Sequence, residues 1–261
     1  MIISTGERPK PEVAERARAL AGRLGVSYAP RGNASVAKLL AEYRDDDLLI
    51  VLHQGVRLLR SGAAPLQFHP SMGFVRAKRV LKGETDPLAA AAGMIPGDSV
   101  LDCTAGLGAD SLVLAVSGGE ETSVTALESS LPLYALLSEG MASYDSGLPE
   151  VDSALRRIEV VNSGHLDYLR SLPDRSVDIV YFDPMFREPL YDSAAISPLR
   201  SFADSSALSE GSVAEALRVA RKSVVLKEKR GSGEFSRLGF QEQLRQGNKT
   251  SYGVIAIDNR S

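Results

Sequence analysis

The sequence has little of the chemistry that binds metals or forms disulfides. Its single cysteine, Cys103, excludes an internal disulfide framework and a cysteine-based zinc cluster. The histidines His53, His69 and His165 lie too far apart in the chain to form a local metal motif. We therefore expect no bound metal.

The chain also lacks an apolar run long enough to span a membrane, and Ile2 and Ile3 are followed at once by polar and charged residues, unlike a signal peptide. We therefore expect a cytoplasmic protein with no membrane contact. Hydrophobic residues make up 44% and charged residues 24% of the 261 positions, which is the usual balance of a globular protein.

The net charge of −3 conceals an asymmetry along the chain. Residues 1–90 hold 14 Lys and Arg against 9 Asp and Glu, whereas residues 91–261 hold 16 against 24. A basic front half is a weak indication of a polyanionic partner, and the alternative is scatter between solvated faces. The basic stretch from Phe74 to Lys82 likewise allows two interpretations. It is either a solvated helix face or linker, or a segment that contacts phosphate beside an active site.

The most informative stretch is a predicted strand, glycine turn and helix over residues 99–117. Asp102 stands at the end of the strand, and Gly106 and Gly108 form the turn. Such a unit brings backbone N–H groups and a helix N-terminus close to a ligand at the edge of a parallel sheet. Asp102 and Asp110 both lie at that edge, where acidic groups suit a ligand with hydroxyls or a positive charge better than one carrying phosphates.

Strands and helices alternate through the rest of the chain. This alternation predicts a doubly wound, Rossmann-like α/β fold, and a last strand over Ser251–Ile257 suggests an antiparallel edge hairpin. The sequence predicts a loop or frayed helix end over residues 145–155 and a polar loop able to act as a lid over residues 187–203. It also predicts a small N-terminal α/β appendage over residues 1–75, followed by the main domain over residues 76–261.

A second carboxylate favours a nucleoside-containing ligand. Glu128 ends the next strand, 20 residues beyond Gly108, where a carboxylate can accept both hydroxyls of a ribose. A nicotinamide dinucleotide needs a third glycine where Ser111 stands, and Asp110 would repel its pyrophosphate. The cationic sulfonium of S-adenosylmethionine (SAM) would instead be attracted. Electrostatics therefore favours SAM, with a dinucleotide-dependent oxidoreductase as an alternative.

A third carboxylate heads the sequence Asp-Pro-Met-Phe. Asp183 ends the fourth predicted strand, so it should face the same crevice as Asp102 and Glu128. The lone pair of an exocyclic base amine is delocalised, and an acceptor for its N–H groups can orient that lone pair toward a methyl carbon. Asp183 or the carbonyl of Pro184 can supply the acceptor, and Phe186 offers a ring on which a base can stack. The alternative is a strand-end turn with Phe186 in the core.

These motifs resemble a known family. Asp102–Gly108 is similar to the acidic-glycine motif of class I SAM-dependent methyltransferases. Asp-Pro-Met-Phe resembles the Asp/Asn-Pro-Pro-aromatic motif of their amino-methylating branch, with Met185 in place of the second proline. Together with Val-Val-Leu-Lys at 224–227, both motifs look like the RsmJ-type family, which methylates the guanine N2 amine in small-subunit ribosomal RNA. The resemblance covers about residues 70–258.

The resemblance implies a seven-stranded methyltransferase sheet, SAM as the cofactor, and ribosomal RNA or the small ribosomal subunit as the partner. It implies that Asp183, Pro184 and Phe186 serve the target amine, and Lys227 and Lys229 are candidates for contact with an RNA phosphate. The implied cofactor residues are Asp102, Gly106, Gly108, Ala109 and Asp110 in the turn, Glu128 and Ser129 at the ribose, Gly164 and His165 beside the adenine, and Asp183. Two more alternatives stay open: a methyltransferase acting on a small molecule or protein, and a binder without catalysis.

Overall fold

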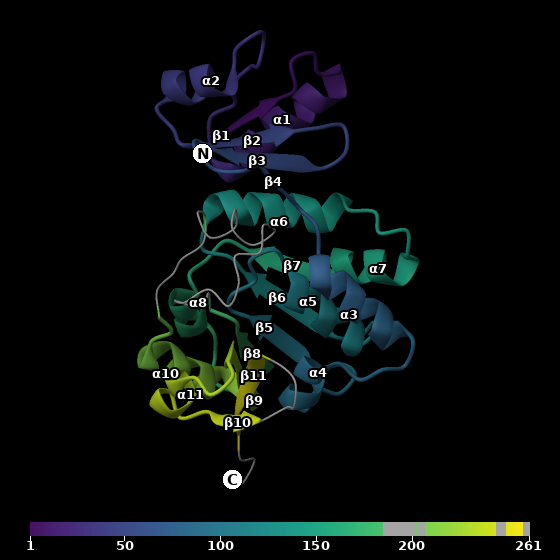
Figure 1. Cartoon of the computed structure of the whole chain (residues 1–261), viewed down its shortest axis with the longest axis vertical. Coiled ribbons are helices and arrows are strands. Elements are labelled where there is room, and N and C mark those ends of the chain that lie inside the picture. The colour runs from purple at the N-terminus through teal and green to yellow at the C-terminus, as the bar shows by residue number, and fades with distance from the viewer. Residues whose placement is uncertain (185–201, 203–206, 244–248, 258–261) are drawn as a thin grey trace.

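The structure, a computed structural model, describes residues 1–184, 202, 207–243 and 249–257. A small N-terminal sheet lies above a larger sheet with helices on either side, and helix α6 (Leu131–Ser143) lies between the two (Figure 1). The expected lid over residues 187–203 falls outside the described residues, apart from Phe202. No helix in the described part of the chain is long and apolar enough to cross a membrane.

A seven-stranded mixed sheet forms the larger unit. Its strands are β5 (Ser99–Asp102), β6 (Ser123–Leu127), β7 (Ile158–Val161), β8 (Val177–Phe182), β9 (Ala220–Lys229), β10 (Gln241–Gln243) and β11 (Thr250–Ala256). Across the sheet they run in the order β10-β11-β9-β8-β5-β6-β7. The strands from β9 to β7 are parallel, whereas β11 is antiparallel to both β9 and β10. This topology confirms the doubly wound sheet and the antiparallel edge.

Helices cover both faces of this sheet. One face holds α3 (Ser71–Leu81), α4 (Pro87–Ala92), α5 (Ala109–Ser117), α6 and α7 (Pro149–Arg157), and the other holds α8 (His165–Ser171), α10 (Glu210–Val219) and α11 (Gly233–Arg237). Alternate strand residues supply the two cores, since successive side chains of a strand point to opposite faces. Tyr181 and Val225 pack on the α5 face, and Phe182 and Leu226 pack on the α10 face.

Two elements differ from the sequence prediction. The expected loop or frayed helix end over residues 145–155 is wrong, because α7 begins at Pro149, which suits a first helical turn. The buried residues Val151, Ala154 and Leu155 fall on one face at helical spacing, and the rest of this short helix is mostly polar. Strand β10 carries the polar sequence Gln-Glu-Gln, which has no apolar alternation to indicate a strand.

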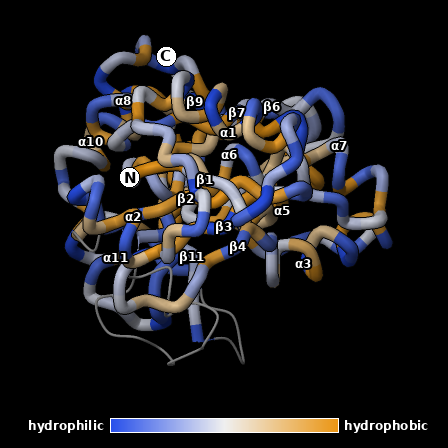
Figure 2. The backbone as a smooth tube through the Cα atoms, turned by 90° about the horizontal axis from the view of Figure 1, so that it is seen from above, coloured by the Kyte–Doolittle hydropathy of each residue, from blue (hydrophilic) through white to orange (hydrophobic). Residues whose placement is uncertain are grey.

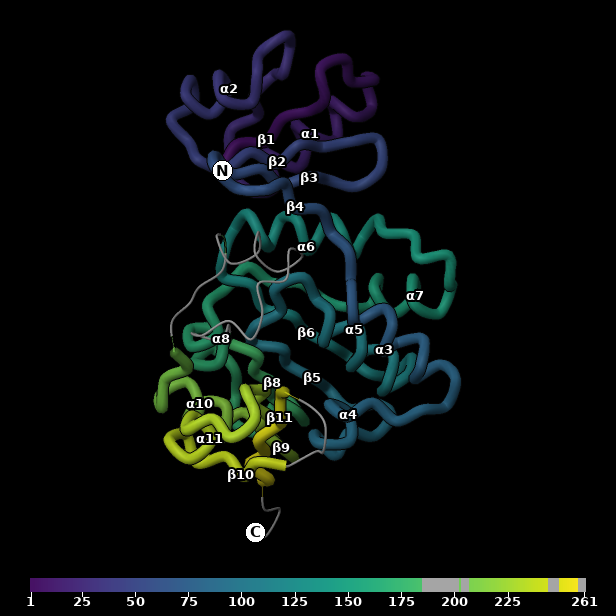
Figure 3. The backbone as a smooth tube through the Cα atoms, in the orientation of Figure 1, coloured from purple at the N-terminus to yellow at the C-terminus, as the bar shows by residue number. Residues whose placement is uncertain are grey.

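The N-terminal unit is a four-stranded sheet with two helices. It consists of β1 (Ile2–Thr5), α1 (Pro11–Leu24), α2 (Val36–Tyr43), β2 (Asp47–Val51), β3 (Val56–Arg60) and β4 (Leu66–Gln67), and its strand order is β1-β2-β3-β4. The core that includes α1 and α6 packs on one face, and α2 packs on the other. The chain then runs from β4 past α6 into α3 (Figure 3). The expected boundary between residues 75 and 76 falls within α3, which packs on α5.

Helix α6 is shared by both units. Its Leu133, Ala135 and Leu136 pack with the N-terminal sheet, and its Leu137 and Met141 pack with the larger sheet. Seen from above, many of the hydrophobic stretches lie inside the outline of the molecule, and hydrophilic stretches predominate around it (Figure 2). A helix that buries two faces must be apolar on both, which explains why α6 lacks a single apolar stripe.

Gly140 of α6 lies against the linker that joins the two units. A Cβ atom at Gly140 would lie 2.0 Å from Cγ of Phe68. We expect Gly140→Ala to lower the free energy of unfolding by about 1–3 kcal/mol, because the packed ring must move. Gly22→Ala is the matched control: nothing lies within 4 Å of the added carbon in α1, so alanine should stabilise that helix by up to about 1 kcal/mol. Urea unfolding measures both changes, and an unaltered midpoint for Gly140→Ala would contradict this packing.

Candidate active site

Three acidic residues stand where neighbouring parallel strands end. Asp102 closes β5, Glu128 follows β6, and Asp183 follows β8. Because these strands are adjacent and parallel, the three residues share the carboxyl edge of the sheet, as the sequence predicts. Thr104 links two of them: its backbone N–H donates to Asp102 at 3.1 Å, and its hydroxyl accepts from the backbone N–H of Asp183 at 2.6 Å.

The turn between β5 and α5 depends on two glycines in the left-handed conformation. Gly106 has a φ of 55° and Gly108 a φ of 72°. A Cβ atom at Gly108 would also lie 2.1 Å from Cε of Met141. On the other side, a Cβ atom at Gly73 of α3 would lie 2.4 Å from the carbonyl oxygen of Ala109. The start of α5 is therefore held between α3 and α6.

Asp102 is a buried carboxylate whose hydrogen bonds do not fully offset the cost of burying its charge. Its side chain accepts a hydrogen bond from the hydroxyl of Ser111 at 2.5 Å, and the residue is 1% exposed. Burial raises the pKa of Asp102 to about 7, although the bonds from Ser111 and Thr104 act in the opposite direction. The nearby charges of Asp110 and Asp183 raise it further. An ionised Asp102 therefore needs positive charge that the surrounding protein does not supply.

Asp110, in the first turn of α5, lies in a cluster of opposite charges. Its carboxylate pairs with the guanidinium of Arg76 and with the ammonium of Lys227, the latter at 2.8 Å, and it accepts from the hydroxyl of Tyr181 at 2.8 Å. Burial alone would raise the pKa of Asp110, but Lys227 and Arg76 hold it below its ordinary value. Arg76 also binds both carboxylate oxygens of Asp86, at 2.8 and 2.9 Å. Arg76 and Lys227 are thus paired within the protein, which disfavours the contact with phosphate that the sequence left open for both.

Asp183 is the most accessible carboxylate around Lys227. Its side chain is 25% exposed, against 9% for Asp110, and it pairs with Lys227 at 2.7 Å. Burial raises the pKa of Asp183 to about 6; Lys227 lowers it, and the Asp110 carboxylate raises it. Pro184 follows directly and is partly buried, whereas Phe186 lies outside the described residues.

Glu128 and its neighbours form the part of the edge next to β7. Glu128 is 7% exposed, and its carboxylate accepts from the backbone N–H of Ser130 at 2.8 Å. The side-chain amide of Asn162 donates to the carbonyls of Glu128 and Ser129 at 2.8 and 3.2 Å. Asn162, which the sequence analysis does not single out, therefore connects the segment after β7 to the segment after β6.

His165 begins α8 directly after Gly164. Its Nε2 atom lies 3.1 Å from Oγ of Ser212 in α10, and its ring meets Phe182 edge-on with centroids 5.7 Å apart. The structure thus places Gly164 and His165 just beyond β7, at the same edge as Glu128.

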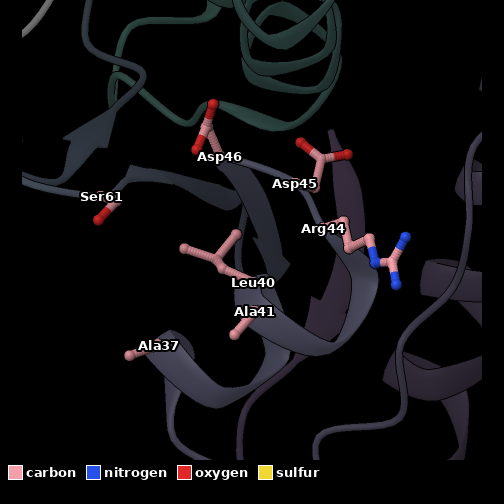
Figure 4. Close-up of a pocket in the computed structure, with 7 residues that line it drawn as sticks. All are labelled: Ala37, Leu40, Ala41, Arg44, Asp45, Asp46 and Ser61. Atoms are coloured by element: carbon pink, nitrogen blue, oxygen red, sulfur yellow. The ribbon is translucent and has the colours of Figure 1, made fainter.

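A separate cleft of about 340 Å³ lies in the N-terminal unit, beside α2 and β2 (Figure 4). Its lining contains none of the residues of the carboxyl edge: Ala37, Leu40, Ala41, Arg44, Asp45, Asp46 and Ser61. Asp45 is already paired with the N-terminal amine at 2.6 Å. Within the described ranges, no group of three or more His, Cys, Asp and Glu residues could hold a metal ion.

The carboxylates of this edge fit SAM. Burial raises the pKa of Asp102 to about 7 and that of Asp183 to about 6, and neighbouring carboxylates raise both further, so a positive charge close to them would stabilise their ionised forms. A ligand with sulfonium and ammonium groups supplies that charge. A pyrophosphate would instead meet carboxylates, since Arg76 and Lys227 are already paired.

Comparisons with known proteins show which family the chain belongs to. Residues 39–238 match the family model described as "Putative SAM-dependent methyltransferase". The chain is 41% identical to "Uncharacterized protein YpiP" of Bacillus subtilis, over 97% of this chain and 98% of that protein. It is 32% identical to "Ribosomal RNA small subunit methyltransferase J" of Chromohalobacter salexigens, over 74% of this chain and 73% of that protein. Its fold is similar to the crystal structure of a SAM-dependent methyltransferase from Neisseria gonorrhoeae, with a TM-score of 0.64, 22% identity, and coverage of 100% and 98% of the two chains.

Proposed function

This chain belongs to the SAM-dependent methyltransferase family, and from that premise we propose that it methylates the N2 amine of a guanine in small-subunit ribosomal RNA. A relative at 32% identity is named as a methyltransferase of that RNA. The observation that supports the proposal is the position of Asp183, a partly exposed carboxylate directly before Pro184, at the same sheet edge as Asp102 and Glu128.

SAM supplies an electrophilic methyl carbon bound to a sulfonium. Asp183 accepts an N–H group of the guanine amine, which turns the nitrogen lone pair toward that carbon, and it then holds the departing proton. Its pKa, raised to about 6 by burial, makes it a better proton acceptor than an ordinary aspartate. The carbonyl of Pro184 is the second acceptor for the amine. The reaction needs no covalent bond between protein and RNA.

We also propose which residues hold the two ligands. The cofactor residues are Asp102, Gly106, Gly108, Ala109, Asp110, Glu128, Ser129, Gly164, His165 and Asp183. Among them, Asp110 acts indirectly: its ion pairs with Arg76 and Lys227 hold these two side chains in place beside the site. The guanine must leave its stack to reach Asp183, and Phe186 provides a ring for it to stack on.

The decisive experiment uses small ribosomal subunits from cells that lack this protein. Incubation of these subunits with purified protein and methyl-labelled SAM should transfer one methyl group per subunit, and mass mapping should find N2-methylguanosine at one position. The same position should carry no methyl group in the cells that lack the protein. If the protein binds SAM tightly but labels neither the subunits nor their extracted RNA, the proposed substrate is wrong.

A further inference from the structure

We propose that Lys227 is the positioning residue of the methyl-transfer site: its ammonium group binds one carboxylate oxygen of Asp183 and leaves the other to accept from the target amine. The inference rests on the proposed role of Asp183. It assigns Lys227 a purpose different from contact with RNA, since its side chain is 20% exposed and bonded to two carboxylates.

The register of the sheet places this lysine opposite Asp183. Leu226 of β9 pairs with Phe182 of β8, and Lys227 and Asp183 are the next residues along these two parallel strands. Tyr181 and Val225 pack on the α5 face of the sheet, so residues two positions further point to that same face. The lysine ammonium therefore reaches both Asp183, at 2.7 Å, and Asp110 of α5, at 2.8 Å.

Asp110 holds the Lys227 ammonium in place by a hydrogen bond separate from the one to Asp183. The Asp110 carboxylate is itself held by the guanidinium of Arg76 and by the hydroxyl of Tyr181 at 2.8 Å. Arg76 is in turn bound through two hydrogen bonds to Asp86, which also accepts from the backbone N–H of Leu88 at 2.8 Å. Each group up to Lys227 is thus immobilised by at least two partners. An ammonium held in this way can define where the Asp183 carboxylate lies.

Asp183 is the last member of a series of paired side chains whose charges alternate in sign. The order is Asp86, Arg76, Asp110, Lys227 and Asp183, which gives three negative groups and two positive ones. The carboxylates of Asp86 and Asp110 are each held by two or more side-chain and backbone donors, whereas among the described residues Lys227 is the one donor to the Asp183 carboxylate. The remaining acceptor capacity therefore lies at the exposed end of the cluster, where a substrate amine can use it.

Within the described part of the chain, several elements around Asp183 carry charged or titratable groups. They are Lys227 on β9, Asp110 on α5, Asp102 on β5, Tyr181 on β8, and, around Lys227 and Asp110, Arg76 on α3 and Tyr252 on β11. Lys227 and Arg76 are the cations of this set, and Lys227 is the one that touches Asp183. Removing its charge should therefore raise the pKa of Asp183 above about 6, the value it has beside Lys227.

The test compares Lys227→Met with Lys222→Met. Lys222 lies on the same strand and pairs with buried Asp98, away from the site, so it controls for loss of a buried ion pair. Carboxyl-carbon NMR of aspartate-labelled protein gives the titration of Asp183, whose signal is identified by its absence in Asp183→Asn. We expect Lys227→Met to raise this titration by about 1–3 pH units and Lys222→Met to leave it unchanged.

Methyl transfer provides a second readout. In Lys227→Met the acidic limb of the rate profile should move to higher pH, with a loss of about tenfold or more at pH 7 that is partly recovered at pH 9. In Lys227→Arg, which keeps the charge and the fold, Asp183 should titrate as in wild type, but methyl transfer should be slower, because the guanidinium has a different shape.

If Asp183 titrates at the same pH with and without a cation at position 227, the inference is overturned. If the titration moves but wild-type protein labels no ribosomal RNA, the proposed substrate fails and the link between Lys227 and Asp183 stands.

Discussion

Asp183→Ala should reduce methyl transfer to ribosomal RNA at pH 8 by at least about 100-fold, the lower end of what a positioned acceptor contributes. The same change should leave the protein at least as stable as wild type. Burial raises the pKa of Asp183 to about 6 from an ordinary 3.8, so its ionised form is the less favourable one in the fold. The stability that comes from binding this proton is present below pH 3.8 and is lost as the pH rises through about 6.

Thermal unfolding at pH 8 and methyl transfer on one preparation separate these two effects. Asp183→Asn is the matched control, since its side-chain oxygen still accepts from an amine but cannot take the proton, and it should retain more activity than alanine. A stable Asp183→Ala protein with full activity would remove Asp183 from the mechanism. A variant that unfolds instead would show that this carboxylate is structural.

Asp110→Asn should cause the largest loss of stability, about 3–5 kcal/mol, because it leaves two buried cations without their shared anion. The carboxylate of Asp110 pairs with Arg76 and Lys227 and accepts from Tyr181. Asparagine can still accept one hydrogen bond, but it carries no charge. Cofactor affinity should fall as well, since Asp110 lies in the first turn of α5 directly after the glycine turn.

The dependence on pH identifies the cause of this loss. The pKa of Asp110 is lowered by its cations from an ordinary 3.8, so its contribution is complete above that pH and disappears as the pH falls below it. The difference between wild type and Asp110→Asn in urea unfolding should therefore shrink below pH 3.8. Asp98→Asn is the control, because Asp98 pairs with Lys222, which is 33% exposed, and should lose less. Equal losses for the two variants would show that Asp110 does not hold the cluster together.

The alternation of strands and helices in the larger unit, its antiparallel edge and the shared position of Asp102, Glu128 and Asp183 followed from the sequence. The apolar pattern of the strands and the glycine turn are signals that a short stretch of sequence carries by itself. Parallel neighbouring strands then bring their carboxyl ends to one edge of the sheet. Helix α7 is harder to recognise, because its apolar face consists of three residues, Val151, Ala154 and Leu155, in a segment of nine that is otherwise mostly polar.

The partners of the basic residues could not be predicted either. Arg76 lies 34 residues from Asp110 in the chain, and Lys227 lies 117 residues from it. A single sequence gives no reason to pair such distant charges, so solvated side chains and contacts with phosphate stayed open for both residues. Thr104, Ser111 and Asn162 likewise become visible only when their hydrogen bonds to the three acidic segments are seen.

Because α6 completes the interior of two sheets at once, neither sheet can be removed without uncovering the other. A chain cut before α3 would expose the flank formed by Leu133, Ala135 and Leu136 to water. It would also leave Glu139 without its ion pairs to Arg16 and Arg23 at the outer side of the same helix. Helix α6, which follows Glu128, would then lose its packing on that side, so the N-terminal sheet stabilises the segment after β6 and is not a detachable module.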